Sequence, residues 1–294
     1  MMKPRQVIPE SGDDIATGPD TTGHEWDGIK EYNNPMPRWW LWTMYATIVW
    51  GIAYAIAYPS WPLITKATPG LLDYTARGAL EEDIRRFNAS NAPLDEALVR
   101  MELDQVQSDT NLYAYALRGG AAVFRNHCSQ CHGSGAAGAT GYPNLLDDDW
   151  LWGGSEDAIR YTVAHGIRNE NDADARFSQM PAYGEFLETE EIDNLVEYVL
   201  SLSGQDHRIE MAVAGSELFA EQCSACHGDA GLGNQEEGAP NLTDAIWLFG
   251  GGRDEIRHSI YYSRYGVMPN WNERLTESQI RQVSLYIHQL GGGE

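Results

Sequence analysis

The sequence predicts a mainly α-helical protein, in which one N-terminal transmembrane helix is followed by two related helical domains. Three observations carry this prediction. Residues 39–65 include no charged side chain, a pentapeptide of the form C-x-x-C-H occurs twice, and the segments around its two copies repeat as well. An internal repeat of this kind indicates two copies of one structural unit.

The uncharged stretch contains the predicted span, residues 39–62. A helix rises about 1.5 Å per residue, so roughly 20 residues cross the apolar core of a bilayer. Tryptophans mark both ends of the stretch, as is typical of membrane interfaces. They are Trp39, Trp40, Trp42 and Trp61. A cleaved signal peptide is the alternative, since Ala55-Ile-Ala57 has the form of a cleavage site. The long, acidic tail 1–38 favours a retained anchor instead.

The pentapeptide holds all four cysteines of the chain. C-x-x-C-H is the attachment sequence of c-type haem, in which two thiols add to the haem vinyl groups and the histidine lies against the iron. We therefore expect two covalently bound haem c groups. Their attachment residues and proximal ligands are Cys128, Cys131 and His132 in the first copy, and Cys223, Cys226 and His227 in the second.

Zinc binding, dithiol redox chemistry and disulfide formation are the alternatives for a C-x-x-C pair. Zinc sites use similar spacings, but their second ligand pair follows within about a dozen or two residues. Here the two pairs lie in different halves of the chain. A disulfide across two intervening residues is strained and labile. The histidine directly after each pair favours haem over all three.

Each pentapeptide lies inside a longer repeat, copy one at 109–207 and copy two at 208–294. In both copies a helical pattern precedes the pentapeptide. Pro-Asn-Leu, a tryptophan with a glycine pair, a Met-Pro and a closing helix follow it. Pro143 and Pro240 begin the Pro-Asn-Leu segments. By analogy with small c-type cytochromes, their carbonyls are expected to accept a hydrogen bond from the proximal histidine Nδ1; a simple turn proline is the alternative.

Met180 and Met268 are the candidates for the second axial ligand of each iron, because among the internal methionines only these two recur at matching positions of the repeat. Methionine opposite histidine raises the potential of a cytochrome c. The proline that follows each methionine disfavours a helix there and keeps the loop extended. Core filling is the alternative role for a methionine, and ligation of one iron by a second histidine is another.

Residues 63–108 are expected to form a helical connector, because their apolar residues have helical spacing and their outer faces are charged. Asn91-Ala-Pro93 is expected to break the helix. The net charge of −23 lies mostly beyond the N-terminal tail. An acidic surface would attract a basic partner protein over long range, or serve only to keep the protein soluble. The same charge disfavours binding to nucleic acid.

The segment His24–Trp42, HEWDGIKEYNNPMPRWWLW, closely resembles the entry segment of the dihaem subunit of cbb3-type cytochrome c oxidases, the CcoP or FixP family. The order of tail, anchor and two tandem class I cytochrome c domains is similar over nearly the whole length. The resemblance implies partnership with a haem–copper catalytic subunit and a monohaem cytochrome c subunit. Electrons from a donor cytochrome c would enter at this chain, which has no catalytic centre of its own, and end at oxygen.

The resemblance further implies the bacterial inner membrane. Some members of the family have two spans, whereas this sequence predicts one. Haem is attached on the oxidising side, so both copies are expected in the periplasm and the tail 1–38 in the cytoplasm. Crossed ligation also follows from the resemblance as an option, with Met180 on the haem of Cys223 and Met268 on the haem of Cys128; sequence spacing leaves direct ligation equally open. A dihaem cytochrome of another respiratory enzyme and a dihaem peroxidase are the competing functions.

Overall fold

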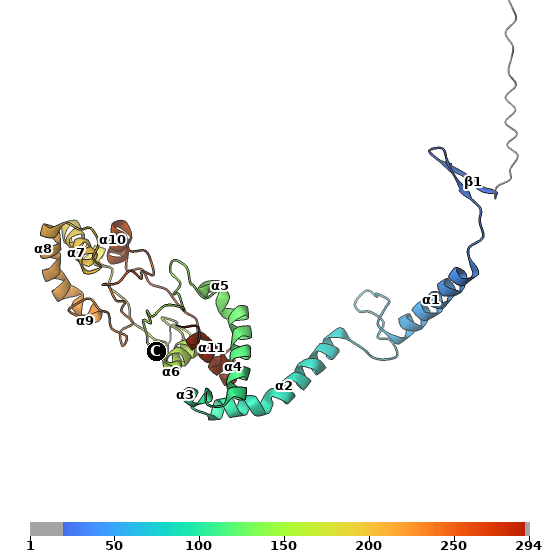
Figure 1. The fold of residues 1–294 in the computed structure, drawn as a ribbon, viewed down its shortest axis with the longest axis horizontal. Helices are drawn as coiled ribbons and strands as arrows, with labels where there is room; N and C mark the ends of the chain where they lie inside the picture. The colour runs from blue at the N-terminus through green and yellow to red at the C-terminus, as the bar shows by residue number, and fades with distance from the viewer. Residues whose placement is uncertain (1–19, 292–294) are drawn as a thin grey trace, which may run out of the picture. The chain divides into compact units, whose positions relative to one another are not determined.

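The computed structural model describes residues 20–291 and is mostly helical (Figure 1), which confirms the predicted fold class. Residues 1–19 of the predicted tail and residues 292–294 lie outside the described part. The chain divides into two compact units that meet between Phe87 and Asn88. The first unit holds the candidate span, and the second holds both C-x-x-C-H motifs.

A β-hairpin precedes the candidate span. Strands β1 (Thr21–Trp26) and β2 (Ile29–Tyr32) pair antiparallel. The turn between them consists of Asp27 and Gly28, which both have positive φ, at 48° and 85°. Asp-Gly is a favoured sequence for a two-residue hairpin turn because both residues tolerate this conformation. The hairpin was not among the elements expected from the sequence.

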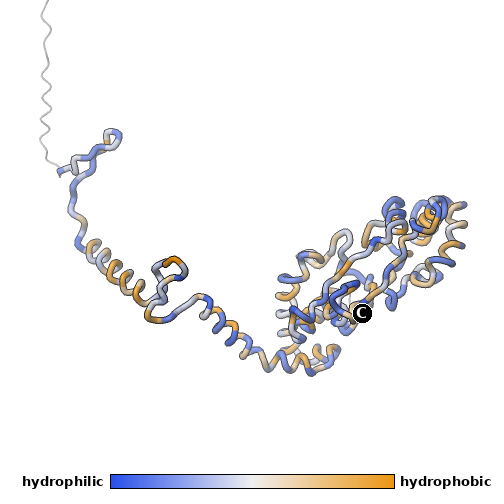
Figure 2. Tube along the Cα trace, turned by 180° about the vertical axis from the view of Figure 1, so that it is seen from behind, coloured by the Kyte–Doolittle hydropathy of each residue, from blue (hydrophilic) through white to orange (hydrophobic). Residues whose placement is uncertain are grey.

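Helix α1 (Arg38–Ala57) is the one helix in the described residues that is long and apolar enough to cross a membrane. It is largely orange in Figure 2, and none of its residues is buried. The helix ends at Ala57, short of the predicted end at residue 62. Pro59 and Pro62 explain this end, because proline lacks the N–H that a continuing helix needs and disfavours helical geometry in the residue before it.

Helix α2 (Ala76–Arg100) runs through Pro93, so the predicted break at residues 91–93 is wrong. The C-terminal half of α2 is held by tertiary packing, which outweighs the hydrogen bond that proline removes. Leu98 is completely buried, and Leu94 and Met101 pack beside it in the same apolar cluster.

The second unit consists of short helices joined by irregular segments. In chain order they are α3 (Leu103–Val106), α4 (Thr110–Val123), the π-helical turn η1 (Phe124–Cys128), α5 (Ser129–His132), α6 (Glu156–His165), the 3-10 turn η2 (Tyr183–Glu185), α7 (Thr189–Leu202), α8 (Ile209–Gln222), α9 (Ser224–His227), α10 (Arg253–Tyr262) and α11 (Glu277–His288).

The two copies of the repeat exchange their closing helices. Helix α4, which opens copy one, packs on α11, which closes copy two; α8, which opens copy two, packs on α7, which closes copy one. Glycines allow both close approaches. A Cβ on Gly120 would lie 2.1 Å from the Gln282 carbonyl oxygen, and one on Gly215 would lie 2.1 Å from that of Asn194.

The apolar cores follow the same exchange. The first core joins Phe124, Cys128 and Ile159 of copy one to Ile280 and Val283 of copy two. The second core joins residues of α7, from copy one, to those of α8 and α10, from copy two. Each packed core therefore contains residues from both copies of the sequence repeat.

Candidate haem-binding sites

The second C-x-x-C-H motif begins where α8 ends. Cys223 follows the last residue of α8 and precedes the single-turn helix α9, which ends at His227. Cys223 and Cys226 both line one cavity of the structure. Gly228 ends the turn with φ of 76°, a conformation that glycine adopts without strain.

The first motif has the same placement at the end of α4, where the backbone passes through η1 into α5. Cys128 is buried and Cys131 is exposed. Gly133, with φ of 79°, ends α5 as Gly228 ends α9. The structure therefore gives both motifs one local geometry.

The histidine of each motif makes the hydrogen bond to a proline carbonyl that the sequence predicted. His132 Nδ1 lies 3.0 Å from the Pro143 carbonyl oxygen, and His227 Nδ1 lies 3.1 Å from that of Pro240. A carbonyl accepts only, so Nδ1 carries the proton in each ring and Nε2 is left available to a metal. Burial lowers the pKa of both histidines, against the smaller opposing effect of the carbonyl. This favours the neutral imidazole that binds a metal.

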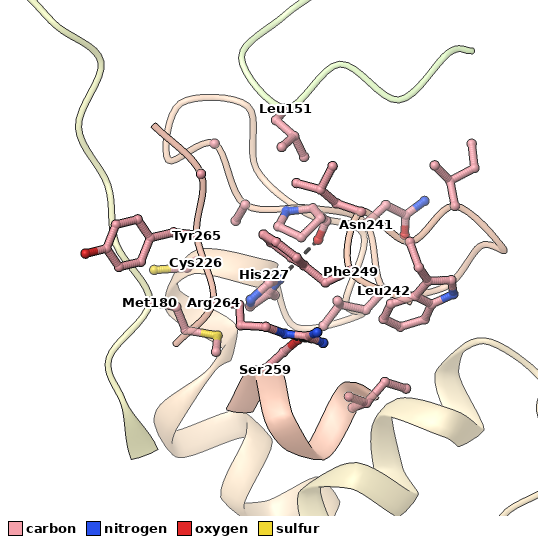
Figure 3. Close-up of a pocket in the computed structure, with 18 of the residues that line it drawn as sticks. Leu151, Met180, Cys226, His227, Asn241, Leu242, Phe249, Ser259, Arg264 and Tyr265 are labelled. Carbon is pink, nitrogen blue, oxygen red and sulfur yellow. Dashed lines mark hydrogen bonds between the residues drawn. The ribbon is translucent and has the colours of Figure 1, made fainter. Parts of the chain in front are cut away.

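A cavity of about 410 Å³ lies beside the second motif. Its lining includes His227, Cys223 and Cys226, together with Met180. Figure 3 shows the Met180 side chain close to that of His227, with both side chains directed into the same space. The volume falls in the range typical of ligand and cofactor sites.

Met180 belongs to copy one, yet its loop is fixed to copy two. The Tyr183 hydroxyl donates to the Gln222 carbonyl oxygen at 2.6 Å, directly before Cys223. The Ser263 hydroxyl, at the end of α10, donates to the Met180 carbonyl oxygen. The loop therefore lies at the second motif, although its sequence follows the first.

Met268 shows the reverse arrangement. It exchanges two backbone hydrogen bonds with Ile167 of copy one, at 2.9 and 3.0 Å. Three residues later, the Trp271 ring lies 5.3 Å from that of His127, which precedes Cys128. Met268 and Trp271 both pack against the core that contains Cys128. Each methionine is thus brought to the motif of the other copy.

The other histidines are not placed as second ligands at the cavity, where His227 is the only histidine in the lining. His165 Nδ1 lies 3.0 Å from an oxygen of Asp172, and His127 lies beside Trp271. These contacts agree with the packing and surface roles that the sequence allowed.

Buried donors support the fit of haem to this unit. Trp152 is 9% exposed, and its Nε1 is one of two buried side-chain donors in the described residues without a hydrogen-bond partner. A buried N–H needs an acceptor, and haem propionates are strong acceptors. Arg168 and Arg264 line the cavity and add positive charge. Sequence reasoning missed the two arginines, which no motif marks. Trp152 lies in the repeated segment of tryptophan and a glycine pair, but that pattern assigned it no role.

Burial also bears on the alternatives for the cysteines. It raises the pKa of Cys128 and of Cys223 to about 11, with a smaller rise from the neighbouring cysteine. Zinc binds the thiolate, so this raised pKa disfavours a zinc site. The two C-x-x-C pairs also belong to different apolar cores, Cys128 to the first and Cys223 to the second. They are therefore not arranged as the four ligands of one zinc ion.

The fold and the two motifs define a class: membrane-anchored proteins with tandem c-type cytochrome domains. Two family models match the chain. The N-terminal domain of cytochrome oxidase-cbb3, FixP, matches residues 18–65, and cytochrome c oxidase, cbb3-type, subunit III, matches residues 116–199 and 210–287.

Curated relatives give the same result over nearly the full length. The chain is 56% identical to the cbb3-type cytochrome c oxidase subunit CcoP of Cereibacter sphaeroides, over 94% of this chain and 96% of the relative. It is 46% identical to the subunit FixPc of Rhizobium leguminosarum bv. viciae, over 95% and 98%. The chain belongs to the CcoP/FixP family of cbb3-type cytochrome c oxidase subunits.

Proposed function

We propose that the chain is the electron-entry subunit of a cbb3-type oxidase. It would accept electrons from a donor cytochrome c and deliver them to the monohaem subunit, from which they reach the haem–copper centre. In this proposal oxygen is reduced in a partner subunit, and this chain has no catalytic centre of its own. The family supports a role in electron transfer within the oxidase.

The observation that carries the proposal is the matched environment of the two motifs. Each has its proximal histidine hydrogen-bonded to a proline carbonyl and a methionine loop fixed beside it. Haem iron bound at such a site would alternate between the ferrous and ferric states, gaining or losing one electron. A histidine and a methionine holding each iron would leave no site for peroxide, which disfavours the peroxidase alternative.

The residues of the chain would have distinct roles in holding two haem c groups. Cys128 and Cys131 would bind the first covalently, and Cys223 and Cys226 the second. The imidazoles of His132 and His227 would each supply Nε2, with Nδ1 fixed by proline. Apolar neighbours exclude water, which tunes the potential of a bound haem.

We further propose crossed axial ligation. Met180 would complete the iron held by His227, and Met268 the iron held by His132. Support comes from the anchoring of the Met180 loop to Gln222 and Ser263, and of the Met268 loop to Ile167. Crossed ligation would join the two haem sites mechanically, because each site would need a loop from the other copy.

The membrane placement in this proposal is a single span with the N-terminal tail in the cytoplasm and the haem sites in the periplasm. The apolar helix α1 supports the anchor. Covalent haem attachment, which takes place on the oxidising side of the membrane, supports the orientation.

Replacing each methionine by histidine tests the proposal. The purified oxidase should carry, on this chain, two haems that survive denaturation in acidified acetone. Met180→His should lower one of their potentials, by roughly a few hundred millivolts within the ~0.8 V range that ligands can span. Met268→His is the matched variant and should lower the other.

Combining each variant with a haem-attachment mutation identifies the affected haem. Met180→His with Cys131→Ala, which removes the first haem, should retain the shifted potential, and Met180→His with Cys226→Ala should lose it. The opposite assignment would refute crossed ligation and leave the electron-entry role standing. Unchanged potentials and full oxygen consumption in both single variants would refute the ligand assignment itself.

A further inference from the structure

The loop that follows α1, residues 58–75, folds back onto the end of that helix. Leu71 N–H donates to the Ile56 carbonyl oxygen and Leu72 N–H to that of Ala57, both at 3.0 Å. The last carbonyls of a helix have no partner within the helix, and here the returning loop provides two. Gly70 allows the approach: its φ is +74°, and a Cβ there would lie 2.5 Å from the Ala57 oxygen.

The loop also satisfies much of its own backbone. Thr68 N–H donates to the Trp61 carbonyl oxygen at 3.0 Å, Trp61 N–H donates to the Thr68 hydroxyl at 3.2 Å, and Leu63 N–H donates to the Lys66 carbonyl oxygen at 2.7 Å. Three prolines in the loop have no N–H to satisfy. An irregular segment enters an apolar medium at low cost only when its backbone groups are paired in this way.

Large apolar side chains of this loop are nevertheless exposed. Ile64, at the tip, is fully exposed, and Leu71 is 82% exposed. Trp61, Leu63 and Leu72 are exposed as well. In Figure 2 the orange colour of α1 reappears in the loop that follows it. An apolar surface of this kind, on a segment that pairs its own backbone, indicates a surface that is covered in the native setting.

Charge indicates what covers it. The chain has a net charge of −23, yet residues 39–72 contain no carboxylate and one charged residue, Lys66. Lys66 lies beside Ile64 at the tip, where a long side chain extends its amine to lipid phosphates while its stem stays in apolar surroundings. Tryptophan is favoured at the same depth of a bilayer. The loop is also continuous with α1, an apolar helix of which no residue is buried.

We propose that residues 58–72 form a membrane-embedded cap on the span, with Trp61, Leu63 and Ile64 inserted among the lipids at its C-terminal end. The occupant of this surface is the bilayer interface. The cap supplies partners for the terminal carbonyls of α1 and fixes the depth at which the chain leaves the membrane. The proposal is independent of the electron-transfer role.

A nitroxide attached to Ile64→Cys tests the cap in the assembled oxidase, reconstituted in nanodiscs of phosphatidylcholine. The spin label reports its collisions with oxygen, which concentrates in lipid, and with a nickel chelate, which stays in water. Oxygen accessibility should exceed nickel accessibility several-fold. Leu71→Cys should give the same result, and it serves as the second position if a label at the tip disturbs the turn.

Glu81→Cys is the matched control, because Glu81 is exposed on α2 in the same unit. Its label should prefer nickel, and the unmodified oxidase should take up no label. An Ile64 label that behaves like the Glu81 label would place the loop in water and overturn the proposal. A label hidden from both reagents would show that a protein partner covers the loop, which would overturn it equally.

Discussion

Gly120→Ala is expected to destabilise the first core by forcing α4 away from α11. The added methyl group would lie 2.1 Å from the Gln282 carbonyl oxygen and 2.6 Å from the Tyr286 Cβ. Carbon atoms make optimal contact at about 3.5–4.0 Å, so the helices must separate by roughly 1 Å. Both obstacles lie close to the backbone of α11 and cannot rotate away.

The expected cost follows from two opposing contributions. Overpacking a helix junction costs about 1–3 kcal/mol, and the lost van der Waals contacts are part of this cost. Alanine in place of a helical glycine recovers about 1 kcal/mol through its helix propensity. The free energy of unfolding should therefore fall by up to about 2 kcal/mol, which lowers Tm by up to roughly 8 °C in a unit of this size.

Thermal unfolding of the purified chain, followed by circular dichroism, measures the change. Gly119→Ala is the matched control, since its methyl group would meet the end of the Gln282 side chain and no backbone atom. Moving that amide weakens only its long hydrogen bonds to Asp95 and Ser278, at 3.4 and 3.3 Å, so the loss of stability should be smaller than for Gly120→Ala. Equal Tm values for the two variants would refute the close approach of α4 to α11, and with it the exchange of closing helices.

Two further substitutions test charged groups. Glu197 is 1% exposed and accepts hydrogen bonds from Arg253 at 2.7 and 3.1 Å; Glu197→Ala should cost about 1–3 kcal/mol in urea unfolding, since it removes hydrogen bonds between charged groups while the half-exposed arginine can turn to water. The hydrogen bond from Arg253 also lowers the pKa of Glu197, so this contribution is present above the ordinary glutamate pKa and is lost as the pH falls through the lowered one. Burial, with Asp244 and Asp147 nearby, raises the pKa of Asp149 from 3.8 to about 6, so the folded chain loses stability as the pH rises through this interval. Asp149→Asn should therefore stabilise by about 1–2 kcal/mol at pH 7, after allowance for solvent screening, and little near pH 4; equal effects at both pH values would contradict the raised pKa.

The sequence was informative where chemistry requires particular residues at a short spacing. The C-x-x-C-H motifs and the two prolines were found in this way, because a thiol pair, an imidazole and its acceptor lie near one another along the chain. The apolar composition of α1 was equally direct. Arg168 and Arg264 have no such local signal, and only the folded chain brings them to the cavity.

The exchange of closing helices was beyond sequence reasoning for a different reason. The closing segments that contain α7 and α11 share one apolar pattern: Leu187, Ile192 and Tyr198 in copy one correspond to Leu275, Ile280 and Tyr286 in copy two. Either helix offers a similar apolar face to α4 or α8, so pairing within a copy and pairing between copies satisfy the same pattern. Tertiary contacts and the connections between helices decide which of the two pairings forms. An alignment of the two repeats contains neither.

The exchanged helices set an order for folding during synthesis. The elements of the second core, α7 to α10, are contiguous in the chain and can assemble once residue 262 has emerged. The first core must wait for α11, the last helix, and must close a loop that spans nearly the whole unit, which is slow for entropic reasons. Until then the apolar face of α4 stays uncovered and prone to aggregation. The first motif to leave the ribosome thus belongs to the last core to close.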